Sequence, residues 1–192
     1  MVDLVSLHKH FISQHLCEGD VAVDFTMGNG NDTLYLSRAV GPLGRVYAFD
    51  IQQEALDSTA ELLASSGAPD NYQLICASHH LVKDYVKEPI KAGMFNLGYL
   101  PRSGRKAVTT MRVTTLPAVQ AALELLAPDG VLIVAIYPGH EEGALEGEML
   151  REYFSTLSRF RICASEFRIL NSPTSPYFFL LEKSPKTRFG EI

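Results

Sequence analysis

The stretch VAVDFTMGNGND, residues 21–32, decides the fold of this chain. Small or β-branched apolar residues lead to Asp24, and Gly28 and Gly30 follow before an amphipathic segment begins at Asn31. This order predicts a strand, a glycine loop and a helix. Glycine has no Cβ, so the loop can turn sharply against a ligand, and the N-terminus of the helix presents free N–H groups at the same place. The stretch therefore predicts a binding site for a small polar molecule.

A second acid lies at the end of the next predicted strand. The run RVYAFD, residues 45–50, ends in Asp50, twenty residues after Gly30. A carboxylate at this place in a strand–helix–strand unit can accept hydrogen bonds from both hydroxyls of a ribose. Together, the glycine loop and Asp50 predict a nucleoside cofactor.

The glycine pattern and Asp24 indicate which nucleoside cofactor binds. A dinucleotide loop carries a third glycine where this chain has Thr33, and Asp24 would repel a pyrophosphate. S-adenosylmethionine carries an ammonium, a sulfonium and a ribose, which suit an acidic strand end. The segment DFTMGNG, residues 24–30, resembles the acidic glycine motif of class I methyltransferases, with Thr26 in place of its first glycine. We therefore expect Asp24 and Asp50 to hold opposite ends of S-adenosylmethionine.

Length and composition indicate one globular domain over residues 1–192. Of the 192 residues, 46% are hydrophobic and 20% are charged, which suits a full core. The formal charge of −5 argues against a broad nucleic-acid surface, so any contact with RNA has to be local. No apolar run is long enough to cross a bilayer, and the N-terminal residues lack the unbroken apolar segment of a signal peptide. We expect a soluble, cytoplasmic protein without membrane contact.

The cysteines are expected to be reduced thiols in the core. Cys17, Cys76 and Cys163 are far apart, odd in number and set among apolar residues, which indicates neither a disulfide framework nor a metal cluster. His79 and His80 follow Cys76, but adjacent residues on a helix point in different directions, so we expect no metal site.

Apolar periodicity and Gly/Pro punctuation divide the chain into alternating strands and helices. After the strand that ends at Asp24, strands are expected over residues 45–50, 72–78, 92–97 and 130–138, and helices over 2–17, 32–40, 52–66, 79–86, 114–127 and 141–158. Thr114 or Thr115 is the expected cap of its helix. The runs 160–169 and 176–183 predict a closing hairpin. The pattern predicts an α/β, Rossmann-like fold: a doubly wound, mostly parallel seven-stranded sheet with an antiparallel C-terminal hairpin and helices on both faces. The resemblance of residues 24–30 implies that this is the fold of a class I methyltransferase.

The least ordinary residues follow the predicted strands, where such sheets bind their ligands. NLGYLP (96–101), the paired threonines 114–115, YPGHEEG (137–143) and the Pro-rich hairpin, in this order, resemble the YtqB/MnmM family. The resemblance implies a methyltransferase that uses S-adenosylmethionine to methylate the amine of 5-aminomethyl-2-thiouridine at the wobble position of tRNA, so the anticodon region of tRNA is the expected partner. The chain departs from the family at residues 102–106, where RSGRK replaces two glycines and Asp-Lys.

Methyl transfer to an amine is an in-line displacement, so catalysis consists mainly of holding the nitrogen close to the methyl group. Asn96 stands where amine methyltransferases have the first residue of N-P-P-Y. Its carbonyl oxygen, or a backbone carbonyl near Leu97, can accept an amine hydrogen and aim the lone pair. Tyr99 can stack on a base, with core packing as its alternative role. His140 can take a proton or bond a nucleobase or phosphate, with helix capping as its alternative role.

The sequence thus predicts three groups of site residues and no metal ligand. The expected catalytic residues are Asn96, Tyr99 and His140. The expected cofactor-binding residues are Asp24, Thr26, Met27, Gly28, Asn29, Gly30, Asp32, Asp50, Ile51, Gln52, Ser78, His79, Asn96 and Leu97. The expected RNA-binding residues are Tyr99, Arg102, Arg105, Lys106, Arg112 and Tyr137. The four basic residues of this group lie in a stretch without acids, residues 100–123. This predicts that they bind phosphates of the RNA, and a solvated loop is the alternative.

Other functions stay open from the residues alone. The enzyme could instead methylate ribosomal RNA or a small-molecule amine. A nicotinamide-dependent reductase is opposed by the missing third glycine and by Asp24, and a catalytically silent module that binds S-adenosylmethionine is a third alternative. The sequence also leaves a homodimer open as an alternative to a monomer.

Overall fold

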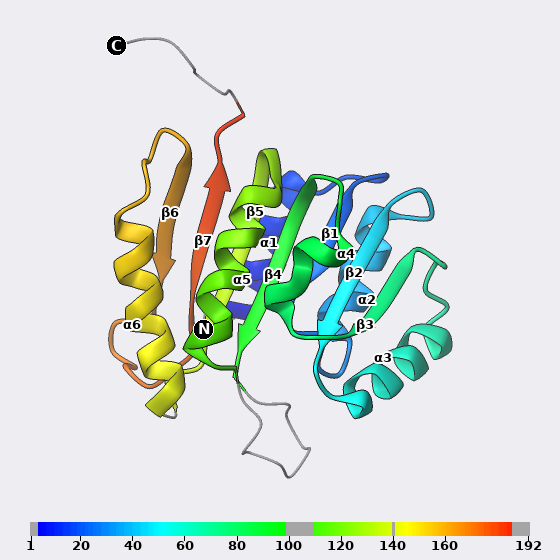
Figure 1. Cartoon of the computed structure of the whole chain (residues 1–192), viewed down its shortest axis with the longest axis horizontal. Coiled ribbons are helices and arrows are strands. Elements are labelled where there is room, and N and C mark those ends of the chain that lie inside the picture. Colours follow the sequence, from blue (N-terminus) through cyan, green and yellow to red (C-terminus); the bar gives the residue numbers. More distant parts are fainter. Residues whose placement is uncertain (1–3, 99–109, 140, 186–192) are drawn as a thin grey trace.

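The structure, a computed structural model, describes residues 4–98, 110–139 and 141–185 as a twisted sheet flanked by helices (Figure 1). The seven strands lie in the order β3-β2-β1-β4-β5-β7-β6. Their bounds are β1 (Val21–Asp24), β2 (Arg45–Asp50), β3 (Tyr72–Cys76), β4 (Ile90–Leu97), β5 (Leu126–Ile136), β6 (Ile162–Phe167) and β7 (Tyr177–Lys183). Strands β1 to β5 are parallel, and β7 runs antiparallel to both β5 and β6. The predicted doubly wound sheet with a C-terminal hairpin is confirmed.

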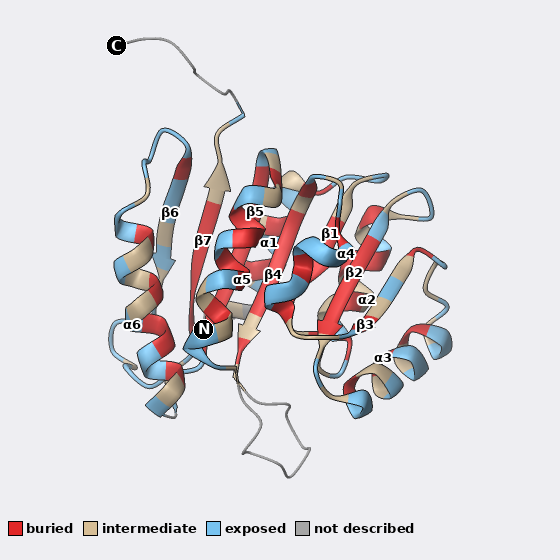
Figure 2. Ribbon diagram, viewed as in Figure 1, coloured by how far each residue is buried: buried red, intermediate tan, exposed pale blue. Residues whose placement is uncertain are grey.

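Helices cover both faces of this sheet. Their bounds are α1 (Leu4–His15), α2 (Asn31–Val40), α3 (Gln53–Ser65), the 3-10 turn η1 (His79–Leu81), α4 (Val82–Tyr85), α5 (Arg112–Leu125) and α6 (Glu141–Ser155). Successive strand residues point to opposite faces. Ala22 belongs to a core cluster that includes residues of α1 and α2, whereas Val23 belongs to the cluster on the other face, which includes residues of α4, α5 and α6. The central strands are buried from both sides (Figure 2). Within the described ranges, no helix is long and apolar enough to cross a membrane.

The start of α5 differs from the prediction. The helix begins at Arg112 with Met111 at the N-cap position, so a cap at Thr114 or Thr115 is wrong. The backbone N–H of Arg112 donates to Oε1 of Glu142 over 3.1 Å. A side chain of α6 therefore satisfies a free N–H of α5, and no local pattern in the sequence of α5 could show this contact.

The thiols are free, but they do not lie in the core. Cys17, Cys76 and Cys163 are all exposed, so their predicted burial is wrong. Cys76 and Cys163 belong to β3 and β6, the two edge strands of the sheet. At an edge strand the flanking helices cover less of the surface, so apolar sequence neighbours do not guarantee burial.

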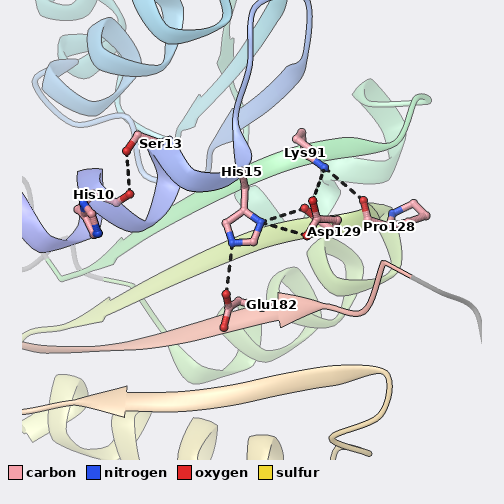
Figure 3. A network of polar contacts seen from close by, with 7 residues as sticks. All are labelled: His10, Ser13, His15, Lys91, Pro128, Asp129 and Glu182. Atoms are coloured by element: carbon pink, nitrogen blue, oxygen red, sulfur yellow. Dashed lines mark hydrogen bonds and ion pairs between the residues drawn. The ribbon is translucent and has the colours of Figure 1, made fainter.

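A polar network lies at the end of the sheet opposite to the carboxyl ends of the parallel strands (Figure 3). His15, the last residue of α1, places Nδ1 3.0 Å from the backbone oxygen of Asp129 and Nε2 3.3 Å from Oε1 of Glu182. Lys91 Nζ pairs with Asp129 Oδ2 at 3.4 Å. Asp129 has a φ of 57°, in the left-handed region that aspartate tolerates better than most residues. These contacts connect α1 with β4, β5 and β7.

Candidate active site

A cavity of about 820 Å³ lies beyond the carboxyl ends of the parallel strands, where open α/β sheets bind ligands. Its first part, the β1–β3 half, is lined by residues 25–29, 49–52 and 77–80. Its second part, the β4–β7 half, is lined by Asn96, Gly98, Tyr137, Pro138, Gly139, Thr174 and Pro176, with Thr110, Met111 and Thr114 beside α5 and His8 from α1. Asn31 and Asp32 of α2 also line it. Two acids, Asp32 and Asp50, and none of the described lysines and arginines border the cavity, which favours a cationic ligand.

The glycine loop has the conformation that its glycines permit. Gly28 and Gly30 have φ values of 54° and 79°, in the left-handed region. A Cβ on Gly30 would lie 2.7 Å from Cγ2 of Thr59, closer than two such atoms can approach. The loop is fixed to β2 by the backbone N–H of Met27, which donates to the oxygen of Phe49 over 2.8 Å. Close packing therefore requires glycine at position 30, although Gly30 itself does not line the cavity.

Asp50 lies where a ribose-binding carboxylate is expected. Its Oδ2 accepts from the backbone N–H of Gly28 over 3.0 Å, and its Oδ1 accepts from the backbone N–H of Gln52 over 3.0 Å. An ionised carboxylate has about four acceptor positions. Asp50 can therefore stay anchored at the end of β2 and still accept hydrogen bonds from two hydroxyls of a ligand.

Asp24 lies elsewhere than expected. Its side chain is completely buried and does not line the cavity, so direct contact with a ligand, the predicted role of Asp24, does not fit this structure. Oδ2 accepts from the hydroxyl of Thr33 over 2.7 Å, and Oδ1 accepts from the backbone N–H of Thr26 over 3.1 Å. Burial, and then the charge of Asp32, raise the pKa of Asp24 to about 7. Asp24 therefore stabilises the glycine loop and the start of α2 through its hydrogen bonds to Thr26 and Thr33.

His79 lines the β1–β3 half of the cavity and carries a buried hydrogen-bond acceptor. Its Nδ1 lies 3.3 Å from the backbone oxygen of Phe25. A carbonyl can only accept, so Nδ1 carries the hydrogen and Nε2 carries a lone pair. Nε2 is buried and has no hydrogen-bond partner among the described residues. Burial lowers the pKa of His79 to about 4, so the ring is neutral at physiological pH.

Asn96 lies at the boundary between the two halves. Its backbone N–H donates to Oγ1 of Thr26 over 2.7 Å, and its Nδ2 donates to Oδ2 of Asp32 over 2.8 Å. Tyr137 also lines the cavity, and its partial desolvation, followed by the charge of Asp32, raises its pKa. An amide, a carboxylate and a phenol therefore gather where the two halves of the cavity meet.

Most of the predicted cofactor-binding residues border the cavity. They are Thr26, Met27, Gly28, Asn29, Asp32, Asp50, Ile51, Gln52, Ser78, His79 and Asn96. Asp24, Gly30 and Leu97 do not border it.

Of the predicted RNA-binding residues, Tyr137 borders the cavity and Arg112 does not. The Nε of Arg112 pairs with Oε1 of Glu142 at 3.1 Å, which weakens its candidacy as a phosphate ligand. Tyr99, Arg102, Arg105, Lys106 and His140 lie outside the described residues. Within the described ranges, no group of three or more His, Cys, Asp or Glu side chains is arranged to hold a metal ion.

Several cavity residues were missed from the sequence. Thr174 and Pro176 belong to the connection before β7, which begins beside the end of β5 because Tyr177 pairs with Ile136. The predicted hairpin topology could have located this connection at the cavity. His8 comes from α1, and its ring contacts Phe178 with centroids 4.3 Å apart. No sequence signal locates His8, because only the packing of α1 across the sheet brings it there.

Comparison with known proteins agrees with this geometry. The family model described as "Putative rRNA methylase" matches residues 46–183. A chloroplastic tRNA (mnm(5)s(2)U34)-methyltransferase from Arabidopsis thaliana is 36% identical over 180 residues, which cover 88% of this chain. The chain spans 65% of the length of that relative.

Two solved structures resemble the whole described fold. A "putative rRNA-methylase" from Clostridium thermocellum superposes with a TM-score of 0.91 at 35% identity, covering 95% of this chain and 98% of that chain. A "putative methyltransferase" from Streptococcus mutans, solved in complex with SAH, superposes with a TM-score of 0.86 at 37% identity, covering 95% of this chain and 99% of that chain. The predicted fold class is confirmed, and because the family model spans well over half of its residues, the chain belongs to the family described as rRNA methylases.

Proposed function

We propose that this protein is a methyltransferase that binds S-adenosylmethionine in the β1–β3 half of the cavity. When bound, this cofactor supplies an electrophilic methyl group on a sulfonium. The main support for this proposal is that one cavity contains both halves. The half lined by Asp50 and His79 is continuous, beside Asp32 and Asn96, with a second half that can take a methyl acceptor. The Streptococcus mutans relative in complex with SAH supports the choice of cofactor.

The residues of the β1–β3 half fit an adenosine. Asp50 has acceptor positions for the two ribose hydroxyls after serving Gly28 and Gln52. His79 lines the same half, and its ring is neutral at physiological pH, which suits a place beside an uncharged adenine. Because the described residues that line the cavity include acids but no lysine or arginine, a positively charged ligand is favoured over a pyrophosphate.

We infer that the acceptor is the 5-aminomethyl group of (2-thio)uridine at the wobble position of tRNA. The Arabidopsis relative is named for the methylated form of this nucleoside, and the resemblance in NLGYLP and YPGHEEG points to the same substrate. The β4–β7 half is lined by Thr110, Thr114 and Thr174. The hydroxyls of Thr110 and Thr114 donate to Glu146 and to the oxygen of Met111, and each can still accept a hydrogen bond from a nucleobase.

Asn96 is the proposed catalytic residue for this reaction. Because Asp32 accepts the Nδ2–H of Asn96, the Oδ1 of the same amide faces away from Asp32 and can accept a hydrogen of the acceptor amine. The neutral amine then directs its lone pair at the methyl carbon; the new N–C bond forms as the C–S bond breaks, and the nitrogen afterwards releases a proton to solvent. Positioning of this kind contributes roughly 7–11 kcal/mol at most.

The proposed function is tested by mass analysis of tRNA nucleosides from cells that lack the protein. We expect 5-aminomethyl-2-thiouridine to accumulate and its methylated product to disappear, and re-expression should restore the product. A normal nucleoside profile would contradict the proposed substrate. Thermal-shift measurements with S-adenosylhomocysteine and with NAD test the cofactor separately: stabilisation by NAD alone would contradict S-adenosylmethionine and favour a reductase.

Ribosomal RNA is a second candidate acceptor, favoured by the description of the family. Purified protein incubated with labelled S-adenosylmethionine and fractionated RNA separates the two candidates. Label in the tRNA fraction supports the wobble uridine, and label confined to ribosomal RNA supports the alternative. Label in neither fraction would favour a small-molecule amine or a silent binding module.

A further inference from the structure

Two acids of α6 hold the end of α5 that borders the cavity. Glu142 and Glu146 are four residues apart on α6 and therefore share one face of the helix. Glu142 Oε1 accepts from both the backbone N–H and the Nε of Arg112, each over 3.1 Å. Glu146 is more deeply buried and bonds Thr110, which precedes α5, and Thr115, which lies in the first turn of α5.

Glu146 is a completely buried carboxylate that serves two hydroxyls. Its Oε2 accepts from Oγ1 of Thr110 over 2.7 Å, and its Oε1 accepts from Oγ1 of Thr115 over 2.5 Å. Burial raises the pKa of Glu146, and the two hydroxyls oppose this shift. A buried charge is expensive, and an apolar side chain of similar size commonly stabilises a core as well. What the carboxylate adds at this place is a fixed geometry for its two partners.

The two partners of Glu146 differ in their relation to the cavity. Thr110 lines the cavity, and its backbone N–H donates to the oxygen of Gly98 over 3.1 Å; Gly98 follows β4 and lines the cavity as well. Thr115 is completely buried and does not line it. One oxygen of Glu146 therefore holds the wall of the β4–β7 half two residues beyond Asn96, and the other oxygen holds the core.

We propose that Glu146 is a positioning residue for the methyl acceptor. It fixes Thr110, and through Thr110 the backbone of Gly98, so that the wall of the β4–β7 half keeps the acceptor in line with the methyl group. Misplacement by about 1 Å can lower a rate by roughly a hundredfold, so a residue without acceptor contact can still control turnover. The inference rests on the proposed function for the acceptor RNA and for the place of the acceptor in the β4–β7 half.

This role is tested by matched variants of Glu146 and of Thr110 and Thr115, the partners of its two carboxylate oxygens. Thr110→Val and Thr115→Val each remove one hydroxyl at constant volume, and Thr110→Ser keeps the hydroxyl at the wall. Glu146→Leu removes both bonds, whereas Glu146→Gln has one acceptor and one donor and can still bond both hydroxyls. The substrate is an anticodon stem–loop RNA with 5-aminomethyl-2-thiouridine at the wobble position.

We expect Thr110→Val and Glu146→Leu to lower kcat/KM for this RNA by roughly tenfold or more, with the affinity for S-adenosylhomocysteine unchanged. Thr115→Val should lower the Tm and leave kcat/KM unchanged, and Thr110→Ser and Glu146→Gln should recover most of the activity. The double variant Thr110→Val/Glu146→Leu should be no worse than either single variant, because both act through one contact. Equal kinetic losses for Thr110→Val and Thr115→Val, or additive losses in the double variant, would overturn the assignment.

Amide hydrogen exchange gives a readout that needs no acceptor. In Glu146→Gln the exchange of the Thr110 amide should stay slow, and in Glu146→Leu it should become faster while the Gly28 amide is unchanged. Uniformly faster exchange in Glu146→Leu would show a purely structural role and overturn the inference. If the wild-type protein does not methylate the RNA, the proposed acceptor fails, and the exchange experiment still decides the role of Glu146.

Discussion

Asn96 Nδ2 donates a hydrogen bond to Oδ2 of Asp32 over 2.8 Å, which connects the end of β4 with the first turn of α2. The backbone N–H of Asn96 donates to Oγ1 of Thr26 over 2.7 Å and fixes the residue from the glycine loop. A carboxylate accepts and does not donate, so the amide of Asn96 has a defined orientation. The two bonds fix Asn96, which lines the cavity, between the glycine loop and α2.

Asn96→Ala should therefore lower kcat on the order of a hundredfold, the effect of losing one positioned polar group in an active site. Calorimetry should show an affinity for S-adenosylhomocysteine within about threefold of the wild type, because the β1–β3 half is intact. Asn171→Ala, at an exposed position before β7, is the matched control. Full activity of Asn96→Ala would contradict a catalytic role.

Asp50→Asn should weaken the binding of S-adenosylhomocysteine. The amide keeps the size of the side chain but loses the charge that strengthens hydrogen bonds from ribose hydroxyls, so Kd should rise by about ten- to a hundredfold. Asp57→Asn, on the exposed side of α3, removes an acid that bonds only to Gln53 among the contacts described, and it should leave Kd unchanged. Equal affinities of the Asp50 and Asp57 variants in calorimetry would argue against ribose recognition by Asp50.

The pKa shifts of Asp24 and His79 predict opposing effects of pH on stability. The folded protein holds the proton of Asp24 up to about pH 7, against 3.8 in the unfolded chain, so the contribution of Asp24 falls as the pH rises through this window. The folded protein keeps His79 neutral down to about pH 4, against 6.5 in the unfolded chain, so the contribution of His79 falls as the pH drops through this window. Between about pH 4 and 6.5 the effects of the two groups on the free energy of unfolding have opposite signs and offset each other.

Single substitutions should separate the contributions of Asp24 and His79 to the pH dependence of the free energy of unfolding. Relative to the wild type, the free energy of unfolding of Asp24→Asn should rise with pH between about pH 4.5 and 6.5, and that of His79→Phe should fall, each by up to about 1.4 kcal/mol per pH unit. Urea unfolding at several pH values measures both. Profiles of the two variants that run parallel to the wild type would show that neither group has a shifted pKa.

Gly30→Ala should destabilise the protein more than Gly67→Ala. Both glycines have a positive φ, 79° and 60°, so each substitution carries backbone strain of about 1 kcal/mol. A Cβ on Gly67 meets no atom within 4 Å, whereas a Cβ on Gly30 meets Thr59 at 2.7 Å. Overpacking adds roughly 1–3 kcal/mol at Gly30, which urea unfolding can resolve. Equal losses for the two variants would contradict the close packing of the loop against α3.

Local patterns account for the parts of the fold that were predicted correctly. The alternation of strands and helices follows from side-chain periodicity, which is a property of consecutive residues. The strand expected over residues 130–138 is β5, whose residues 130–136 are all buried, as in a strand covered on both faces. The acid at Asp50 was predicted to lie at the cavity because every parallel strand ends on the same edge of the sheet.

Contacts between distant segments account for the predictions that failed. Asp24 also ends a parallel strand, yet its side chain turns into the protein because Thr33 of α2 packs over it. The N–H of Arg112 is satisfied by Glu142, thirty residues later in the chain. Cys163 has apolar neighbours in the sequence, but β6 ends the sheet and leaves its side chain exposed.

The sequence by itself determined the order of the elements, the glycine loop and the carboxylate of Asp50, because these depend on residues that are close together in the chain. Only the tertiary structure decided that Asp24 is buried, that Asp32 orients Asn96, and that Glu146 holds the wall of the cavity. These contacts join side chains that lie 9 to 64 residues apart in sequence. Their geometry depends on how α2, α5 and α6 pack on the sheet, and no local pattern encodes that packing.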